Sequence, residues 1–493
     1  MTGSPDAAWV GIDIGTQSVR ALAVARDGVV LGSGAQPLSS HRDGNRHEQD
    51  PEQWWTAAAD ACRQATAGLP PQAVRGVAVD ATSGSVLLID DAGRALTPAL
   101  MYDDGRASTV LDVVNDTGAD VWATLGYGRM QPSWALPKLI WLIRAYPGIV
   151  RGARLAHQSD FVNRRLVGHD VASDLSNALK TGADLIKQTW PQDVLDRLGV
   201  PPHLMPGLTL SGTQLGTVSG PAAAATGLPV GTPVISGMTD GCAAQIGAGA
   251  LREGDWNSVL GTTLILKGVT PHLLHDPSAA VYSHRAPDGD WLPGGASSTG
   301  AGIIARDYAG QDLPDLNRRA VRHEPSSVLA YPLAGRGERF PFVAPRAEAF
   351  LLGRPESSAD RYAAVLQGVA YIERLCIDYL DHLGASVDGS WVITGGATRN
   401  TYWNQVRADV LGRPVSLPEN AEPALGMAVL AASIGRKVRD VAAEMVRIRE
   451  IVEPRADTSQ RYNDPYLRFV DELEGRGWLA PASAAHARER TTR

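Results

Sequence analysis

A short segment near the N-terminus combines a carboxylate, a glycine and three polar side chains within six residues. The segment Asp13-Ile-Gly15-Thr16-Gln17-Ser18 lies between apolar runs that alternate with small or polar residues. This pattern predicts a strand, a tight turn and a returning strand. Gly15 lets the backbone approach a ligand closely. The N–H groups of Thr16, Gln17 and Ser18 can then converge on an anion. Asp13 beside a phosphate would require a metal ion between the two charges. An ordinary hairpin with a polar turn is the alternative.

A second turn of the same kind lies almost half a chain away. Gly261-Thr262-Thr263 follows the apolar run 256–260 and precedes another apolar run. Two related halves that each offer a Gly-Thr turn predict a duplicated fold whose two loops close on one polyphosphate. A third Gly-rich turn, residues 395–400, follows the short apolar run 391–394.

Six motifs in a fixed order resemble those of one protein family. They are Asp13-Ile-Gly-Thr-Gln-Ser, Met101-Tyr-Asp-Asp104-Gly-Arg106-Ala, Lys138-Leu-Ile-Trp141, Gly237-Met-Thr-Asp240-Gly-Cys-Ala-Ala, Leu260-Gly-Thr-Thr263 and Thr394-Gly-Gly-Ala-Thr-Arg-Asn400. With them the chain resembles the FGGY carbohydrate kinases, which share a superfamily with actin, hexokinase and the heat-shock chaperone ATPases. The resemblance implies an α/β, two-domain actin/hexokinase-like (ribonuclease H-like) fold, with duplicated mixed β-sheets flanked by helices and a cleft between them.

Length and composition bound the remaining possibilities. The 493 residues exceed one core and predict two large domains. The resemblance implies residues 1–250 for sugar binding, the first phosphate loop and the catalytic aspartate, and residues 251–493 for the second phosphate loop, adenosine binding and the C-terminal helices. A net charge of −7 without a basic run argues against nucleic acid or an anionic membrane as a partner. No apolar run approaches the roughly 20 residues of a membrane span. The start of the chain lacks the order of a signal peptide, and three scattered cysteines fit a reducing compartment. We expect a cytoplasmic protein and leave a homodimer open.

Two carboxylates are predicted to contact the sugar. Asp80 ends an apolar strand and is followed by Thr82, and strand ends of α/β domains often carry substrate contacts. A helix or turn cap is the alternative for Asp80. The resemblance makes Asp104 an acceptor for a sugar hydroxyl, whereas a local ion pair with Arg106 is the alternative.

Asp240 is the predicted catalytic residue, and it also contacts the substrate. It lies in a Gly-rich turn, residues 237–241, and matches the catalytic aspartate of the family. In the mechanism that this implies, Asp240 takes the proton of the sugar's primary hydroxyl, and the alkoxide attacks the γ-phosphorus of MgATP. Asp240 could instead cap the Ala-rich helix that follows, and both roles can hold together.

The resemblance implies ATP and Mg²⁺ as the cofactors. Asp13 would hold Mg²⁺ largely through water, because this ion keeps most of its hydration shell. Arg20 would add positive charge, although an exposed strand residue is the alternative. The expected nucleotide-binding residues are Gly15, Thr16, Gln17, Ser18, Arg20, Gly261, Thr262, Thr263, Gly295, Thr299, Gly396 and Asn400.

Two helices are predicted around these motifs. The segment that contains Lys138 and Trp141 is expected to be a helix with Lys138 on its surface, and a catalytic role for Lys138 is the alternative. An apolar stripe over residues 362–383 predicts a long buried helix that ends at Gly384. Glu373 and the following arginine are expected on the exposed face of that helix. The histidines form no pattern that predicts a metal site.

The resemblance favours a 2-ketopentose as the substrate. Xylulokinases carry Gln-Met-His-Gly where this chain has Thr82-Ser83-Gly84-Ser85. The segments 80–83, 176–182 and 282–297 look more like those of D-ribulose kinases. We therefore expect D-ribulose first and D-xylulose second, and a pentitol or an L-sugar stays open.

The rival class is a non-catalytic member of the superfamily, either a sugar-responsive regulator or an actin-like assembly protein. A regulator would require a DNA-binding helix-turn-helix, and no basic helical unit flanks the predicted domains. A NAD-dependent enzyme is disfavoured because no Gly-x-Gly-x-x-Gly follows a strand. A P-loop kinase is disfavoured because Gly-x₄-Gly-Lys-Ser/Thr is missing.

Overall fold

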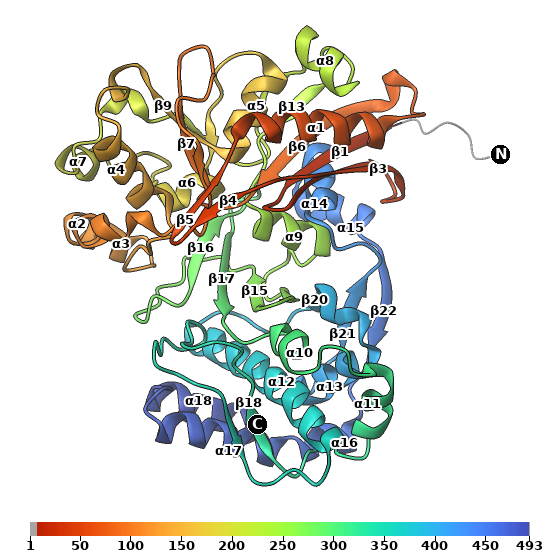
Figure 1. Ribbon diagram of the computed structural model, residues 1–493. Helices are drawn as coiled ribbons and strands as arrows, with labels where there is room; N and C mark the ends of the chain where they lie inside the picture. The colour runs from red at the N-terminus through yellow and green to blue at the C-terminus, as the bar shows by residue number, and fades with distance from the viewer. Residues whose placement is uncertain (1–6, 493) are drawn as a thin grey trace. The chain divides into compact units, whose positions relative to one another are not determined.

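The computed structural model describes residues 7–492. Residues 1–6, which include part of the stretch used for the signal-peptide prediction, and residue 493 lie outside the described residues. The chain divides into two compact units, and Figure 1 colours it by residue number from red at the N-terminus to blue at the C-terminus. The first comprises residues 1–249, 284–292 and 420–447, and the second comprises residues 250–283, 293–419 and 448–493.

The division differs from a simple split of the chain. The first crossing falls after residue 249, close to the expected boundary at 250. Segments 284–292 and 420–447, predicted to belong to the second domain, pack with the first unit. No local pattern predicts these returns, because they depend on partners far away in the chain, such as Ser176 for His284, 108 positions apart.

The core of the first unit is a six-stranded mixed sheet in the order β12-β13-β6-β1-β2-β3. Its strands are β1 (Ala8–Ile14), β2 (Ser18–Ala25), β3 (Val30–Pro37), β6 (Val74–Ala81), β12 (Gln214–Thr217) and β13 (Pro233–Ile235). The first three form the predicted antiparallel meander. β6 and β13 run parallel to β1, and β12 closes the edge antiparallel to β13.

Helices cover both faces of this sheet (Figure 1). α1 (Pro51–Thr66) packs on β2 and β3, and Asp50 caps its start, since Asp50 Oδ1 accepts a hydrogen bond from the backbone N–H of Glu52 at 3.0 Å. α14 (Pro423–Ala432) packs on β1 and β6. Gly11 allows this approach, because a Cβ there would lie 1.8 Å from the carbonyl oxygen of Ala424.

The remaining elements of the first unit surround that layer. A second sheet has the order β4-β5-β8-β7-β9, and β10 pairs with β11. These strands are β4 (His41–Asp43), β5 (Arg46–Gln49), β7 (Val86–Ile89), β8 (Ala99–Leu100), β9 (Arg154–His157), β10 (Ser173–Asp174) and β11 (Leu208–Thr209). The helices are α2 (Leu111–Thr117), α3 (Ala119–Thr124), α4 (Ala135–Ala145), α5 (Gln158–Val167), α6 (Leu175–Ala178), α7 (Gln192–Arg197), α8 (Gly220–Thr226), α9 (Asp240–Ala248) and α15 (Val438–Met445).

The second unit repeats the plan of the first. Its sheet has the order β16-β17-β15-β14-β20-β21-β22, in which residues 284–285 of β16 and 291–292 of β17 belong to the segment assigned to the first unit. The strands are β14 (Trp256–Leu260), β15 (Leu264–Gly268), β16 (Tyr282–Arg285), β17 (Trp291–Ser297), β20 (Trp391–Thr394), β21 (Val415–Pro418) and β22 (Ile448–Val452). An antiparallel meander is followed by two parallel strands and an antiparallel strand. The predicted duplication of an α/β sheet is therefore confirmed.

Helices and one small hairpin complete the second unit. The helices are α10 (Gly302–Asp307), α11 (Leu313–Ala320), α12 (Ser358–His382), α13 (Thr401–Leu411), α16 (Ala456–Arg461), α17 (Asn463–Gly475) and α18 (Pro481–Thr492). The hairpin joins β18 (Leu329–Tyr331) and β19 (Phe350–Leu352). The buried helix α12 ends before Gly384, whose φ of +90° favours glycine, as predicted.

Two predictions of exposed charge are wrong. Lys138 on α4 is fully buried, and so is Glu373 on α12. Glu373 accepts two hydrogen bonds from the Arg407 guanidinium at 2.7 Å each and one from Ser258 Oγ at 2.5 Å. Arg374 is partly buried, with its guanidinium 4.2 Å from the centre of the Tyr466 ring. Helical spacing alone could not reveal partners that come from other segments.

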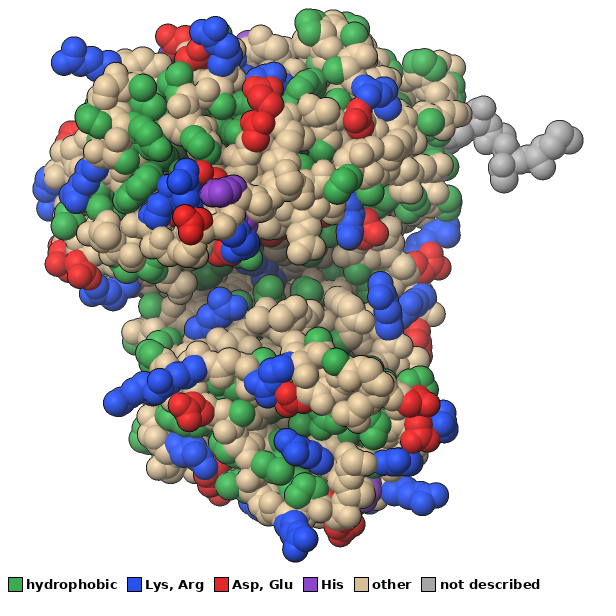
Figure 2. All heavy atoms as spheres, in the orientation of Figure 1, with side chains coloured by type: hydrophobic (Ala, Val, Ile, Leu, Met, Phe, Trp, Pro, Cys, Tyr) green, Lys and Arg blue, Asp and Glu red, His purple; other side chains and the backbone are tan. Residues whose placement is uncertain are grey.

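The surface carries charges of both signs. On the face shown in Figure 2, lysine and arginine side chains are scattered among acidic and uncharged ones. No helix within residues 7–492 is long and apolar enough to cross a bilayer.

Candidate active site

The carboxyl ends of three parallel strands bring the predicted aspartates of the first unit together. Asp13 on β1 is the direct register partner of Asp80 on β6, and neighbouring strands lie about 4.8 Å apart. Thr239, which precedes Asp240, bridges to Ala81 beside the end of β6. Asp240 is the first residue of α9, and its Oδ1 accepts from the N–H of Gly241 at 2.7 Å.

Burial and mutual repulsion dominate the electrostatics of this cluster. Burial, with repulsion from Asp240 adding to it, raises the pKa of Asp13 to about 6, although contact with Asp80 and the charge of Arg20 oppose the shift. Burial and the Asp13 carboxylate raise the pKa of Asp80 well above its usual range. Arg20 is the register partner of Asp13 on β2 and is exposed. The three carboxyls therefore lie close together at the carboxyl ends of neighbouring strands, where burial and repulsion disfavour full ionisation unless a cation is bound.

The residues at this edge fit a magnesium ion. Apart from the Asp13 carboxyl, no donor within residues 7–492 satisfies either oxygen of Asp80. Two neighbouring carboxyls of this kind must share a proton or a cation. Carboxylate oxygens are the ligands that Mg²⁺ takes in phosphoryl-transfer sites.

The first Gly-Thr turn joins β1 to β2, as predicted. The N–H of Gly15 donates to the carbonyl oxygen of Ser18 at 3.0 Å and closes the turn. Gln49, which sequence reasoning missed, supports the turn from outside. Its Nε2 donates to the carbonyl oxygen of Thr16 at 2.7 Å, and its Oε1 accepts from Trp54 Nε1 at 2.6 Å. Gln49 thus holds the turn from 33 positions away in the chain, and no local sequence pattern predicts this contact.

Replacing Gln49 by leucine is expected to raise the KM for ATP about two- to tenfold, the value of one lost hydrogen bond. The reason is that the Thr16 carbonyl would lose the donor that holds the turn. Initial rates at varied ATP and saturating sugar measure the effect.

Gln53→Leu is the matched control. Gln53 also exchanges hydrogen bonds with backbone, but with Ser39 rather than with the turn. Its KM for ATP should stay at the wild-type value. An equal rise in both variants would refute the role of Gln49.

The loop after β6 presents several polar groups without protein partners. Thr82 is anchored, since its N–H donates to Gln158 Oε1 at 3.2 Å and its Oγ1 to the carbonyl oxygen of Ile14 at 3.3 Å. Within residues 7–492, the buried Oγ atoms of Ser83 and Ser85 and the Nε2 of Gln158 have no hydrogen-bond partner. Leaving such groups unpaired costs about 1–3 kcal/mol each. The loop is therefore suited to a ligand rich in hydroxyls.

A buried hydrogen-bond network joins the start of α5 to residues 173–181. His157 Nδ1 lies 2.8 Å from Asp160 Oδ2, and His157 Nε2 lies 2.7 Å from Thr181 Oγ1. Asp174 accepts from the backbone and side-chain nitrogens of Asn177 at 2.8 Å each, and burial raises its pKa to about 6. The N–H of Gln158, next to His157, donates to the carbonyl oxygen of Ser85 at 3.2 Å, so the start of α5 contacts the loop after β6.

Asp104 is engaged in a local ion pair. It is fully buried, accepts from the Arg106 guanidinium at 2.7 Å and accepts from the N–H of His47 at 2.8 Å. The alternative that we raised for Asp104 is thus present in the structure. Its contact with a sugar hydroxyl stays a prediction.

The second Gly-Thr turn joins β14 to β15, the strands that correspond to β1 and β2. The N–H of Gly261 donates to the carbonyl oxygen of Thr263 at 3.0 Å. The carbonyl oxygens of Gly261 and Thr262 accept from the N–H groups of Ala301 and Gly302 at 2.8 and 3.0 Å. The start of α10 therefore backs this turn.

Two expected nucleotide residues of the second unit are used inside its core. A Cβ at Gly295 would lie 2.5 Å from the Phe340 ring, so this glycine permits close packing. Thr299 is buried, and its Oγ1 donates to Glu338 Oε2 at 3.0 Å. Their contact with the nucleotide stays a prediction.

The third Gly-rich turn lies beside the second. Gly395, with a φ of +90°, would bring a Cβ within 2.6 Å of the carbonyl oxygen of Leu260. Gly396 is open, with no atom within 4 Å of such a Cβ. Asn400 begins α13, because its Oδ1 accepts from the N–H of Trp403 at 3.1 Å. Of Gly396 and Asn400, the two residues of this turn that are predicted to bind the nucleotide, Gly396 is thus the one with open space beside it.

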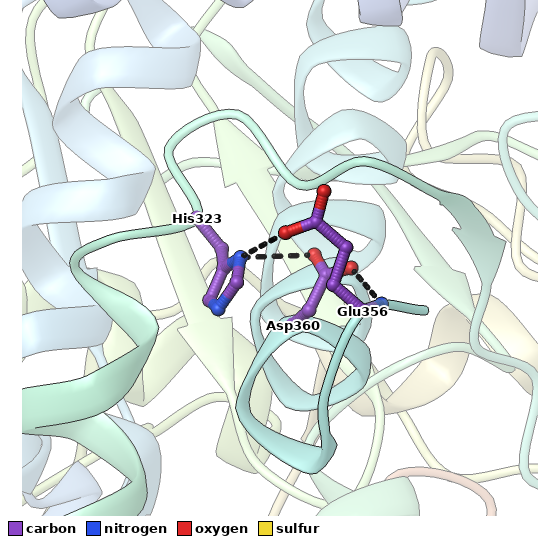
Figure 3. A group of neighbouring side chains, drawn as sticks. All are labelled: His323, Glu356 and Asp360. Atoms are coloured by element: carbon purple, nitrogen blue, oxygen red, sulfur yellow. Dashed lines mark hydrogen bonds and ion pairs between the residues drawn. The ribbon is translucent and has the colours of Figure 1, made fainter. Parts of the chain in front are cut away.

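One histidine and two acids gather elsewhere in the second unit (Figure 3). His323 Nδ1 lies 3.9 Å from Glu356 Oε2 and 3.5 Å from Asp360 Oδ1. Asp360 Oδ1 already accepts from Ser326 Oγ at 2.5 Å, and Oδ2 accepts from the N–H of Glu356 at 2.9 Å. Because the serine and backbone donors occupy this carboxylate, we interpret the group as a clamp at the start of α12.

A duplicated mixed sheet with a Gly-Thr turn in each copy and aspartates at parallel strand ends is the arrangement of the actin/hexokinase-like fold. Residues 8–247 match the N-terminal domain of the FGGY family of carbohydrate kinases, and residues 257–434 match its C-terminal domain. The chain belongs to this family and is a sugar kinase.

Individual relatives agree with this assignment. A xylulose kinase of Streptomyces coelicolor is 30% identical over 97% of this chain and 98% of its own length. An L-fuculokinase of Escherichia coli is 26% identical over 85% of this chain and 90% of its own length. The solved xylulose kinase of Rhodospirillum rubrum has a TM-score of 0.85 at 26% identity, covering 94% of this chain and 98% of its own.

Proposed function

We propose that this protein transfers the γ-phosphoryl group of ATP to a primary hydroxyl of a 2-ketopentose, with D-ribulose as the preferred acceptor. The proposal rests on one observation. Asp13, Asp80 and Asp240 lie together at the carboxyl ends of neighbouring strands, next to the Gly15-Thr16 turn. Phosphoryl transfer needs a cradle for phosphate, a site for a metal and a proton acceptor. The first unit offers a candidate for each.

Asp240 acts as the general base. It is the first residue of α9, and its charge acts on Asp13 and Asp80 at the ends of the neighbouring strands. The proton of the sugar hydroxyl passes to Asp240. The hydroxyl oxygen forms the new bond to the γ-phosphorus, and the bond to the bridging oxygen of ADP breaks.

The remaining residues bind and orient the two substrates. Asp13, with Asp80 beside it, would hold Mg²⁺, which when bound offsets phosphate charge. The Gly15-Thr16 and Gly261-Thr262 turns offer backbone N–H groups and hydroxyls to the phosphates of ATP. Asp80 and the loop of residues 82–85 offer polar groups to the sugar.

The choice of D-ribulose rests on the loop after β6. Ser83, Gly84 and Ser85 replace the Met-His-Gly of xylulokinases, and the two serine hydroxyls are buried without protein partners within residues 7–492. They can pair with sugar hydroxyls in a way that an apolar side chain cannot. D-xylulose is the second candidate, because several relatives are xylulose kinases.

ADP release across a panel of ketopentoses, pentitols and L-sugars tests the proposal. We expect the highest kcat/KM with D-ribulose and a lower value with D-xylulose. The highest kcat/KM with D-xylulose would refute the preference for D-ribulose but not the assignment of the protein as a sugar kinase. No sugar-dependent release with any member would refute the proposed function.

A further inference from the structure

The amine of Lys138 lies at the centre of the first unit's loops rather than on the surface. The side chain is fully buried on α4. Its Nζ donates to four backbone carbonyl oxygens, those of Gly84 at 2.9 Å, Met101 at 2.6 Å, Tyr102 at 2.9 Å and Ser133 at 3.0 Å. An ammonium has three N–H groups, so at least one is shared between two acceptors.

These four carbonyls belong to three separate segments. Gly84 lies in the loop after β6, Met101 and Tyr102 precede Asp104, and Ser133 precedes α4. The segments approach so closely that a Cβ at Gly84, whose φ is +90°, would lie 2.9 Å from the carbonyl oxygen of Ser133. Few groups other than one compact cation could bring these carbonyl dipoles together.

The surroundings of this amine disfavour its charged form. Burial lowers the pKa of Lys138 to about 7, with Lys180 adding to the shift and the carboxylates of Asp104 and Asp103 opposing it. The side chain has no route to a substrate phosphate while all its N–H groups point at backbone oxygens. We therefore expect Lys138 to hold backbone segments in place rather than to contact a substrate.

We propose that Lys138 is a positioning residue for the sugar subsite, because its ammonium joins the 82–85 loop, which follows Asp80, to the segment before Asp104 and to the segment before α4. The inference rests on the proposed function of these segments. Loss of the ammonium would leave four buried carbonyls without their donor and release the segments from one another. The Gly15-Thr16 turn is held instead by the hydrogen bond from Gln49, so we expect its position to stay the same.

Lys138→Met tests the proposal by a comparison of the two KM values. We expect the KM for the ketopentose to rise about tenfold or more, since unpaired buried carbonyls are costly, and the KM for ATP to change less than about twofold. Lys138→Arg keeps the charge and should recover part of the sugar KM. Leu228→Ala, a buried core change in the same unit, lowers stability without this split.

Hydrogen–deuterium exchange gives a readout that does not depend on activity. The N–H groups of Ser85, Asp104 and Trp134 are hydrogen-bonded within the three segments. They should exchange faster in Lys138→Arg, and faster still in Lys138→Met where that variant folds, but not in Leu228→Ala. Unchanged exchange in both lysine variants, or equal changes in the two KM values, would overturn the proposal. Failure of the proposed function would appear separately, as wild-type protein that releases no ADP with any sugar.

Discussion

Asp240→Asn is expected to lower kcat for sugar phosphorylation by roughly 10²–10⁴-fold, the usual contribution of a general base. Asparagine keeps the size of the side chain and can still lie at the start of α9. It cannot take the proton of the sugar hydroxyl. The KM for ATP should change little, because the predicted phosphate contacts come from the Gly-Thr turns.

Steady-state ADP release with saturating sugar and ATP measures this loss. Asp43→Asn serves as the control, because Asp43 is an exposed residue of β4 and its removal should leave kcat unchanged. Near-normal turnover in Asp240→Asn would remove Asp240 from the role of base, even if the protein proved to be a kinase.

Arg407→Met is expected to destabilise the second unit by about 3–5 kcal/mol, the typical effect of breaking a buried ion pair. Both Arg407 and Glu373 are fully buried. Without the guanidinium, the Glu373 carboxylate would keep only the hydrogen bond from Ser258 Oγ. Urea unfolding of the variant against the wild type measures the loss in free energy.

The double variant Glu373→Leu/Arg407→Met provides the decisive control. Replacing both charges by apolar side chains is often close to neutral, because neither charge is then left unpaired. The double variant should therefore be clearly more stable than Arg407→Met alone. Two equal losses would show that packing, rather than the charge pair, sets the stability at this position.

Local signals in the sequence predicted the elements that hold the candidate site. The meander and its Gly-Thr turn follow from a glycine between alternating apolar runs, and β1 and β2 lie where this pattern placed them. α1 begins at Asp50-Pro51 because its capping residue is its immediate neighbour. The second turn was found because duplication repeats the same local pattern in β14 and β15.

Long-range partners could not be predicted in the same way. Lys138 binds carbonyls up to 54 positions away. A sequence pattern cannot predict which carbonyls these are, because every residue has one. Gln49 reaches Thr16 across 33 positions, and Glu373 meets Arg407 across 34. In each case tertiary packing, rather than helical or strand periodicity, decides where the polar side chain lies.

The most direct test of the account is the identity of the product formed from D-ribulose and MgATP, followed by proton-coupled ³¹P NMR. The account predicts one sugar phosphate for each ADP, with its phosphorus signal split into a triplet by the two protons of a primary carbon. A doublet would place the phosphate on a secondary hydroxyl. ADP accompanied only by inorganic phosphate, or no ADP at all, would contradict the account.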